Sequence, residues 1–104
     1  MFRLPKNRPP THPGEMLAEE FLVPLGMTQV DLARRIAVPF QRVNQIVNRR
    51  RAMSPDTALR LARLFGTTPG FWLSLQQRWD LYEASRSAEA REIGRIKPVP
   101  RKAS

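Results

Sequence analysis

Residues 28–48 decide the fold, and their sequence is TQVDLARRIAVPFQRVNQIVN. Thr28 suits a helix N-cap, and the apolar spacing after it predicts a short helix that ends near Ile36. A tight turn then leads to Pro39, which opens a second short helix that ends near Asn48. The segment therefore predicts two short helices joined by a tight turn at Ala37 and Val38.

The side chains of this segment fit two helices that cross at a steep angle. Such a crossing needs a small residue where the helices meet, and Ala33 stands at that position. Apolar residues follow at the spacing that packs the two helices together and onto the rest of the domain: Leu32, Ile36, Val38, Val43 and Ile46. Asp31, three residues after Thr28, predicts an approximate capping box. The pattern predicts a helix-turn-helix.

The outward face of the second helix carries the chemistry that reads DNA base edges. Glutamine pairs with adenine, arginine pairs with guanine, and an apolar ring touches the thymine methyl. We predict base contacts from Pro39, Phe40, Gln41, Arg42 and Gln45. Backbone amides at a helix start and nearby polar or basic side chains suit phosphates. We predict phosphate contacts from Thr28, Gln29, Asn44, Arg49, Arg50 and Arg51.

Helices are also predicted on both sides of this unit. Pro13 suits a first helical position, and the apolar face of that helix holds Leu17, Phe21 and Leu22 before Pro24 to Gly26 end it. Ser54 and Pro55 begin a fourth helix that ends at Gly66 and buries Ala58, Leu61, Ala62 and Phe65. Thr68 and Pro69 begin a fifth helix that ends near Tyr82, with Trp72, Leu75 and Trp79 on one side.

The expected architecture is all-α, with a five-helix domain over residues 13–84. Proline and basic residues predict a flexible basic arm over residues 1–12. Residues 85–104 are polar and basic, and we expect a tail without regular structure. The 104 residues suffice for one compact domain, and no apolar run is long enough to span a membrane. The absence of cysteine excludes thiolate zinc sites and fits a reducing compartment such as the cytoplasm.

The charge distribution supports a nucleic-acid partner. The chain has 18 Lys and Arg against 9 Asp and Glu, a net charge of +9. All but three of these cations are arginine, whose planar fork suits phosphate and guanine. The basic block covers residues 28–63, whereas residues 13–27 are acidic through Glu15, Glu19 and Glu20. The acidic helix is either a solvated face or a surface for a basic protein partner.

A protein that reads two half-sites about 34 Å apart is expected to be a dimer. The fifth helix has more large apolar residues than a small core requires, among them Phe71, Leu73 and Leu81. We assign Phe71 and Leu75 to the core and predict the dimer interface at Trp72, Trp79 and Tyr82.

The segment from Thr28 to Leu75 resembles the Cro/repressor-like (XRE) helix-turn-helix family. More narrowly, the chain is similar to the HigA antitoxins of type II toxin–antitoxin modules. Three stretches carry this similarity: HPGEMLAEEFLVPLGMTQ from His12, RVNQIVNRRR from Arg42, and SPDTALRLARLFGTTPGFWLSLQ from Ser54. The resemblance implies a homodimer that binds a palindromic operator, represses its own operon and neutralises a small basic toxin, a RelE-like ribonuclease.

The chain departs from the family pattern at two turns. Ala37 stands where the family usually has glycine. Because alanine has a Cβ, we expect this turn to avoid a strongly left-handed backbone. Arg49 stands where many relatives have glycine after the second helix, so Asn48 or Arg49 is expected to adopt the left-handed turn.

Of three alternative functions, two are less consistent with the sequence and one is not separated from the antitoxin by the residues alone. An enzyme is disfavoured because His12, the only histidine, stands at a helix start and no catalytic set or metal cluster accompanies it. No cofactor is expected. RNA binding would favour exposed aromatic residues rather than aromatic residues at core spacing. A stand-alone regulator without a toxin fits the residues equally well, and only the resemblance favours the antitoxin.

Overall fold

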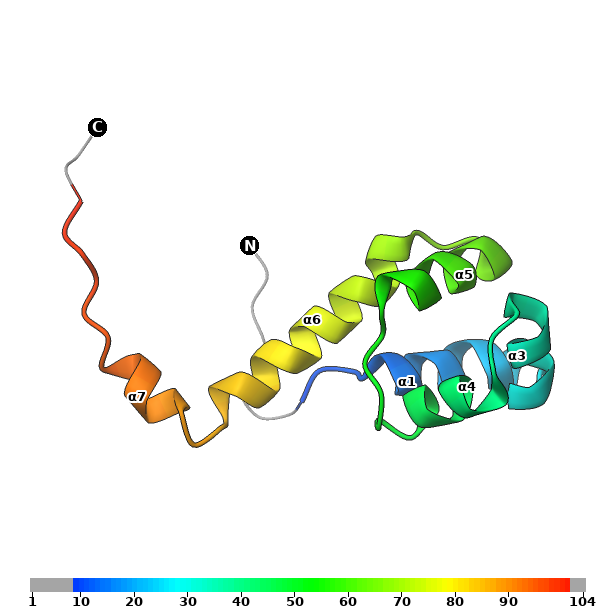
Figure 1. Ribbon diagram of the computed structural model, residues 1–104, viewed down its shortest axis with the longest axis horizontal. Coiled ribbons are helices and arrows are strands. Elements are labelled where there is room, and N and C mark those ends of the chain that lie inside the picture. The colour runs from blue at the N-terminus through cyan, green and yellow to red at the C-terminus, as the bar shows by residue number, and fades with distance from the viewer. Residues whose placement is uncertain (1–8, 102–104) are drawn as a thin grey trace.

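The computed structural model describes residues 9–101, and these contain helices and no strand. The helical segments are α1 (Pro13–Met16), the π-helical η1 (Leu17–Leu22), α2 (Val23–Leu25), α3 (Gln29–Ile36), α4 (Phe40–Val47), α5 (Pro55–Phe65), α6 (Pro69–Ser85) and α7 (Ala90–Gly94). Figure 1 shows α1, α3, α4 and α5 grouped at one end, with α6 leading away to α7 and the C-terminal segment. The all-α prediction is confirmed.

The segments α1, η1 and α2 follow one another without a break and form the predicted first helix. Its central part is π-helical, and the N–H of Val23 donates to the Ala18 carbonyl five residues back. Pro24 has no N–H, so the regular hydrogen-bond ladder cannot continue through it. Gly26 then ends the helix in the left-handed conformation, at φ 61°.

The predicted caps form at the other helices. The side chains of Thr28, Ser54 and Thr68 each accept the N–H three residues on, and Gly66 ends α5 at φ 73°. Only half of the capping box predicted with Asp31 forms: its N–H donates to Thr28 Oγ1, whereas its carboxylate pairs with Arg34 and Arg35. Two charged partners on the same helix face compete successfully for that carboxylate.

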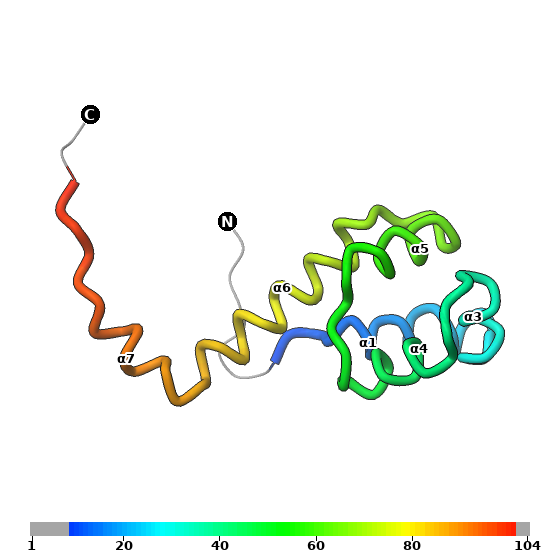
Figure 2. The backbone as a smooth tube through the Cα atoms, in the orientation of Figure 1, coloured from blue at the N-terminus to red at the C-terminus, as the bar shows by residue number. Residues whose placement is uncertain are grey.

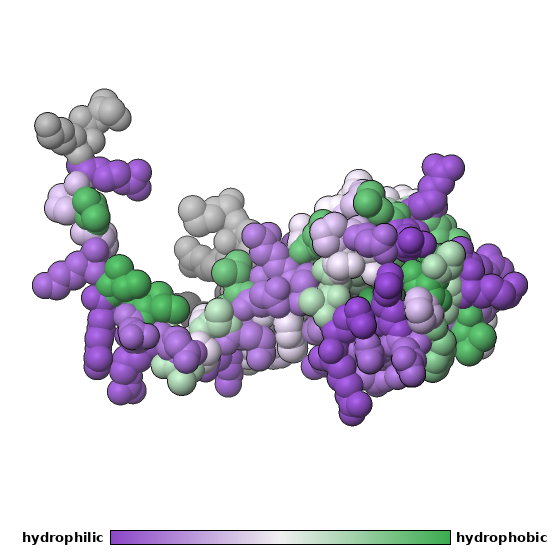
Figure 3. Space-filling view, viewed as in Figure 1, coloured by the Kyte–Doolittle hydropathy of each residue, from purple (hydrophilic) through white to green (hydrophobic). Residues whose placement is uncertain are grey.

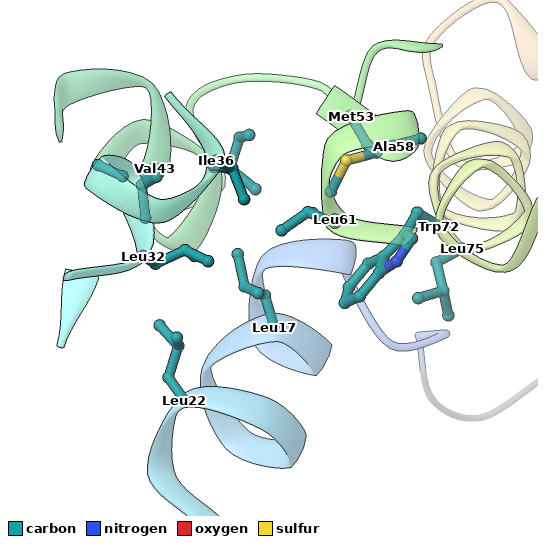
Figure 4. Packing of buried hydrophobic residues seen from close by; sticks show 12 residues of the cluster. Leu17, Leu22, Leu32, Ile36, Val43, Met53, Ala58, Leu61, Trp72 and Leu75 are labelled. Atoms are coloured by element: carbon teal, nitrogen blue, oxygen red, sulfur yellow. The ribbon is translucent and has the colours of Figure 1, made fainter. Parts of the chain in front are cut away.

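The core lies where the first helix, α3, α4, α5 and the start of α6 meet. Its buried members include Leu17, Leu32, Ile46, Leu61 and Trp72, each at most 1% exposed. Figure 4 shows side chains from η1, α5 and α6 converging at the centre of this cluster. The core holds α4 by one face only, which leaves its opposite face exposed.

One glycine allows the first helix to approach α4 closely. A Cβ added at Gly14 would lie 2.0 Å from the carbonyl oxygen of Ile46 and 3.0 Å from the Cα of Val47. The backbone of α1 therefore lies directly against the C-terminal half of α4, as the two adjacent helices in Figure 1 indicate. Position 14 admits no side chain without separating them.

The two ends of the chain differ from the expected arm and tail. Residues 1–8 of the arm lie outside the described residues, and His12 is not part of an arm because it is buried, at 3% exposure. The tail contains α7, which is held by local hydrogen bonds such as Ile93 N–H to the Glu89 carbonyl at 2.9 Å. Figure 2 shows that α7 and the residues after it stand away from the helical body.

No helix within residues 9–101 is both long enough and apolar enough to cross a lipid bilayer.

Candidate nucleic-acid interface

The two helices of the predicted helix-turn-helix, α3 and α4, pack as the sequence indicates. Ala33 is 4% exposed at their contact, and four of the five predicted apolar residues are buried: Leu32, Ile36, Val43 and Ile46. Val38 is half-buried in the turn. The side-chain amide of Asn44 donates to Gln29 Oε1 at 3.0 Å, which joins the outer edges of the two helices.

The turn between these helices has a left-handed backbone at Ala37, with φ 57° and ψ 49°. The expectation that an alanine here avoids this conformation is wrong. The Ala37 N–H donates to the Arg34 carbonyl and the Val38 N–H to the Ala33 carbonyl. Arg60 Nη1 donates to the Ile36 carbonyl at 2.8 Å. These hydrogen bonds hold the turn and offset the steric cost of the Cβ.

Replacing Ala37 with glycine should raise the free energy of unfolding by about 0.5–1 kcal/mol. Relief of the left-handed strain gains about 1–2 kcal/mol, and the greater freedom of glycine in the unfolded chain costs up to about 1 kcal/mol. Urea denaturation followed by circular dichroism measures the difference. A loss of stability would show that the turn carries no strain at this residue.

The exposed face of α4 is a row of amide side chains. Gln41, Asn44, Gln45 and Asn48 stand at positions i, i+3, i+4 and i+7, which share one side of a helix. Gln41 and Asn48 are exposed, whereas Asn44 and Gln45 are half-buried. Asn48, the C-cap of α4, was not among the predicted contact residues, although its i+7 spacing from Gln41 places it on the same side of the helix.

Pro39, Phe40 and Arg42 lie beside this row. Pro39 is the exposed N-cap of α4, and the Phe40 side chain is 44% exposed. Arg42 Nη1 pairs with Asp56 Oδ2 at 3.2 Å, and Asp56 also accepts Arg60 Nε at 2.9 Å. The hydrogen bond from Arg60 and the charges of both arginines lower the pKa of Asp56. Arg42 is thus held by its Nη1 against the start of α5 in this structure.

The start of α3 presents backbone N–H groups next to the α4 face. Thr28 Oγ1 accepts the Asp31 N–H at 3.0 Å, and the first backbone bond runs from Leu32 N–H to the Thr28 carbonyl. The N–H groups of Gln29 and Val30 precede that bond, so they are available to an anion. This geometry fits the predicted phosphate contact at Thr28 and Gln29.

The three arginines after α4 separate into different environments. Arg49 has a left-handed backbone, at φ 63°, which confirms the expectation for that turn. Its guanidinium bonds Glu15 Oε1 at 3.1 Å and lies 5.3 Å from the centroid of the Trp79 ring. Arg51 Nε donates to Gln45 Oε1 at 2.9 Å, and Arg50 is exposed. Figure 3 shows hydrophilic side chains gathered along this side of the body.

His12 closes the inner side of this loop. Its Nδ1 accepts the Gly14 N–H at 2.9 Å, so His12 is the N-cap of α1. Its ring lies edge-on to Trp79, with 4.9 Å between centroids. Burial, followed by the charge of Arg49, lowers the pKa of His12, while Asp80 and Glu15 oppose the shift.

Stability should therefore fall at acid pH through His12. The folded state binds a proton on His12 less readily than the unfolded state does. The contribution of neutral His12 to the free energy of unfolding is therefore fully present above about pH 6.5 and is lost as the pH falls below that value. Urea denaturation across this range measures the slope. The variant His12→Asn retains a cap acceptor that does not titrate and should show a weaker pH dependence; an unchanged slope would assign the effect to other groups.

Trp72 does not belong to the predicted dimer interface. It is 0% exposed, and its indole N–H donates to Thr67 Oγ1 at 2.8 Å. Its side chain is therefore part of the core and cannot contact a second protomer. Trp79 and Tyr82 are half-buried, with their rings 6.2 Å apart.

A separate hollow of about 620 Å³ lies on α6, and its apolar lining includes Leu73, Leu81 and Ala84. The sequence did not indicate this hollow.

The packing of α3 on α4 through Ala33, with amide side chains along the outer face of α4, defines a helix-turn-helix protein of the Cro/repressor type. A family model described as helix-turn-helix matches residues 19–72. Antitoxin HigA-1 of Vibrio cholerae is 37% identical over 93 residues, which cover 89% of this chain and 87% of that protein. The chain belongs to the HigA family of helix-turn-helix antitoxins.

Two further similarities agree with this family. The structure of Pseudomonas aeruginosa antitoxin HigA with the higBA promoter is 39% identical, has a TM-score of 0.82, and covers 88% of this chain and 99% of that one. A protein of Haemophilus influenzae named as an HTH-type transcriptional regulator is 39% identical over 94 residues, which cover 89% of this chain and 88% of that protein.

Proposed function

We propose that this protein is a DNA-binding antitoxin that represses its own operon as a dimer and neutralises a RelE-like ribonuclease toxin. The observation that carries DNA binding is the amide row on the outer face of α4, exposed at Gln41 and Asn48, beside the available N–H groups at the start of α3. Amide side chains read adenine in the major groove, and helix N-termini bind phosphate. The structure of the Pseudomonas relative with its promoter supports the same role here.

Within this proposal the base contacts come from the N-terminal part of α4, namely Pro39, Phe40, Gln41, Arg42 and Gln45. Asn48 extends this surface at the other end of α4. Phosphate contacts come from Thr28, Gln29, Asn44, Arg50 and Arg51, with Arg49 joining them when it leaves Glu15. The phosphate contacts fix the register of α4 in the groove, and the base contacts select the sequence.

Two protomers are needed because a palindromic operator presents two half-sites about 34 Å apart. The surface of α6 is the proposed interface, with the half-buried Trp79 and Tyr82 on one side and the hollow beside Leu73 and Leu81 on the other. Leu81 is 56% exposed in the single chain, an exposure that a symmetric partner helix would remove.

Toxin neutralisation rests on membership of the HigA family and distinguishes this function from a second candidate, a stand-alone regulator. The name of the Haemophilus relative favours that second candidate. Co-expression with the product of the neighbouring reading frame, followed by purification through a tag on one chain, separates the two. A stable complex with a small basic protein supports the antitoxin, and its absence leaves the regulator.

DNA binding is tested by titrating the protein into labelled duplexes and measuring fluorescence anisotropy. One duplex is the DNA upstream of the protein's own reading frame, and the other is a random duplex of equal length. We expect tighter binding to the upstream DNA, two protomers per site and a steep loss of affinity with salt. Equal weak binding to both duplexes would contradict the proposed repressor function. It would show that the basic block over residues 28–63 attracts DNA by charge alone, without reading its sequence.

A further inference from the structure

A groove lies between the first helix and the start of α6. It has a volume of about 450 Å³ and is lined by Thr11, Glu15, Met16, Glu19, Glu20, Phe21 and Phe71. The three glutamates are exposed, whereas the methionine and the two phenylalanines are half-buried. Among the described residues, the lining therefore combines an apolar floor with a rim of three glutamates, one of which, Glu15, pairs with Arg49.

We propose that this groove is the docking site for a basic protein segment with an apolar anchor, and that Glu15 couples docking to the DNA-binding surface. The occupant follows from the lining: the apolar floor takes a side chain such as leucine, and the carboxylates take lysine or arginine beside it. This inference rests on the proposed function, in which the partner is a small basic toxin.

The coupling arises because Glu15 belongs to two sites. It lines the groove, and its Oε1 accepts Arg49 Nη2 at 3.1 Å. Arg49 directly precedes Arg50 in the loop that follows α4, on the side that we assign to phosphate contacts. A cation docked at Glu15 competes with Arg49 for the same carboxylate and so releases Arg49 toward DNA.

The direction of the effect follows from this competition. Once Arg49 has lost its carboxylate partner, its guanidinium can bind a DNA phosphate instead. Docking therefore strengthens DNA binding. Coupling between two binding sites is reciprocal, and DNA therefore strengthens docking by the same factor. The contact between Gly14 and the Ile46 carbonyl holds α1 against α4, so the two surfaces keep a fixed relation while the side chains exchange partners.

The docking site is tested with two synthetic peptides, one alternating lysine with leucine and the other alternating glutamate with leucine. Isothermal titration at low ionic strength should show binding of the lysine peptide only. The double variant Glu19→Gln/Glu20→Gln should weaken that binding by about five-fold or more. Equal binding of both peptides, no binding of either, or an unchanged affinity in the double variant would overturn the docking site.

The coupling is tested by DNA titration of Glu15→Gln, Arg49→Gln and the double variant. Glu15→Gln should tighten DNA binding by about two- to five-fold, the range of an exposed ion pair. The same substitution should have no effect in the Arg49→Gln background. An equal gain in both backgrounds would show a through-space charge effect and overturn the coupling. Absence of DNA binding in the unmodified protein would instead reject the proposed function, while the peptide titration still tests the groove.

Discussion

Replacing Gly14 with alanine should lower the free energy of unfolding by about 3 kcal/mol or more. The new Cβ would lie 2.0 Å from the Ile46 carbonyl oxygen and 2.8 Å from its carbon. Both are backbone atoms of α4 and cannot rotate away as a side-chain end can. Overpacking of an ordinary core costs about 1–3 kcal/mol, and a clash between two helix backbones lies at or above the upper end of that range.

The matched control for this substitution is Gly70→Ala in the first turn of α6. A Cβ at position 70 would meet only Thr68 Oγ1, at 3.9 Å, so the change should be neutral or slightly stabilising. Thermal unfolding of both variants separates the two cases, because about 3 kcal/mol shifts the Tm of a domain this size by roughly 12–24 °C. Equal Tm values for the two variants would show that α1 can move away from α4 at little cost.

Local chemistry explains why most of the helices were predictable. The caps at Thr28, Ser54 and Thr68 depend on a side chain and an N–H three residues apart, so neighbouring residues suffice to specify them. The apolar stripe of α5 likewise depends only on helical spacing, although Phe65 at its end is half-buried and not buried as predicted. The helix-turn-helix unit also followed from the residues themselves, and the family resemblance added the expected operator, self-repression and toxin partner.

Features that depend on distant residues were not predictable from spacing. Gly14 is required by atoms more than thirty positions along the chain, and Arg60 supports the turn at Ala37 from another helix. The left-handed alanine is tolerated because of such support, which local sequence does not show. The burial of Trp72 has the same origin, since α6 has apolar residues on more than one side and only packing decides which of them enter the core.

The candidate site was predictable in position but not in side-chain detail. The spacing of α4 places Gln41 on the outer face, as predicted. Arg42 pairs with Asp56, and Arg51 donates to Gln45. Each interaction joins residues from separate elements or turns, so the sequence did not indicate that these predicted DNA-contacting side chains have partners within the protein. Gln41 has no such partner within the described residues and is the side chain best placed to reach a base directly.

Replacing Gln41 with alanine should therefore weaken binding to the upstream DNA by about 1–3 kcal/mol, a loss of roughly five- to 150-fold. Binding to random duplex should change little, because a base contact contributes to affinity only where the base matches. Anisotropy titrations on both duplexes at one salt concentration give the two affinities. Unfolding midpoints should match those of the unmodified protein, since Gln41 is exposed and not part of the core.

Arg50→Ala provides the contrast that separates base reading from phosphate binding. Arg50 is exposed in the loop after α4, and loss of one phosphate contact should weaken binding to both duplexes about equally and reduce the salt dependence by about one ion. If Gln41→Ala instead weakens both duplexes equally, α4 does not read sequence through this residue. A loss confined to the upstream DNA in Arg50→Ala would move that arginine from the phosphates to a base edge.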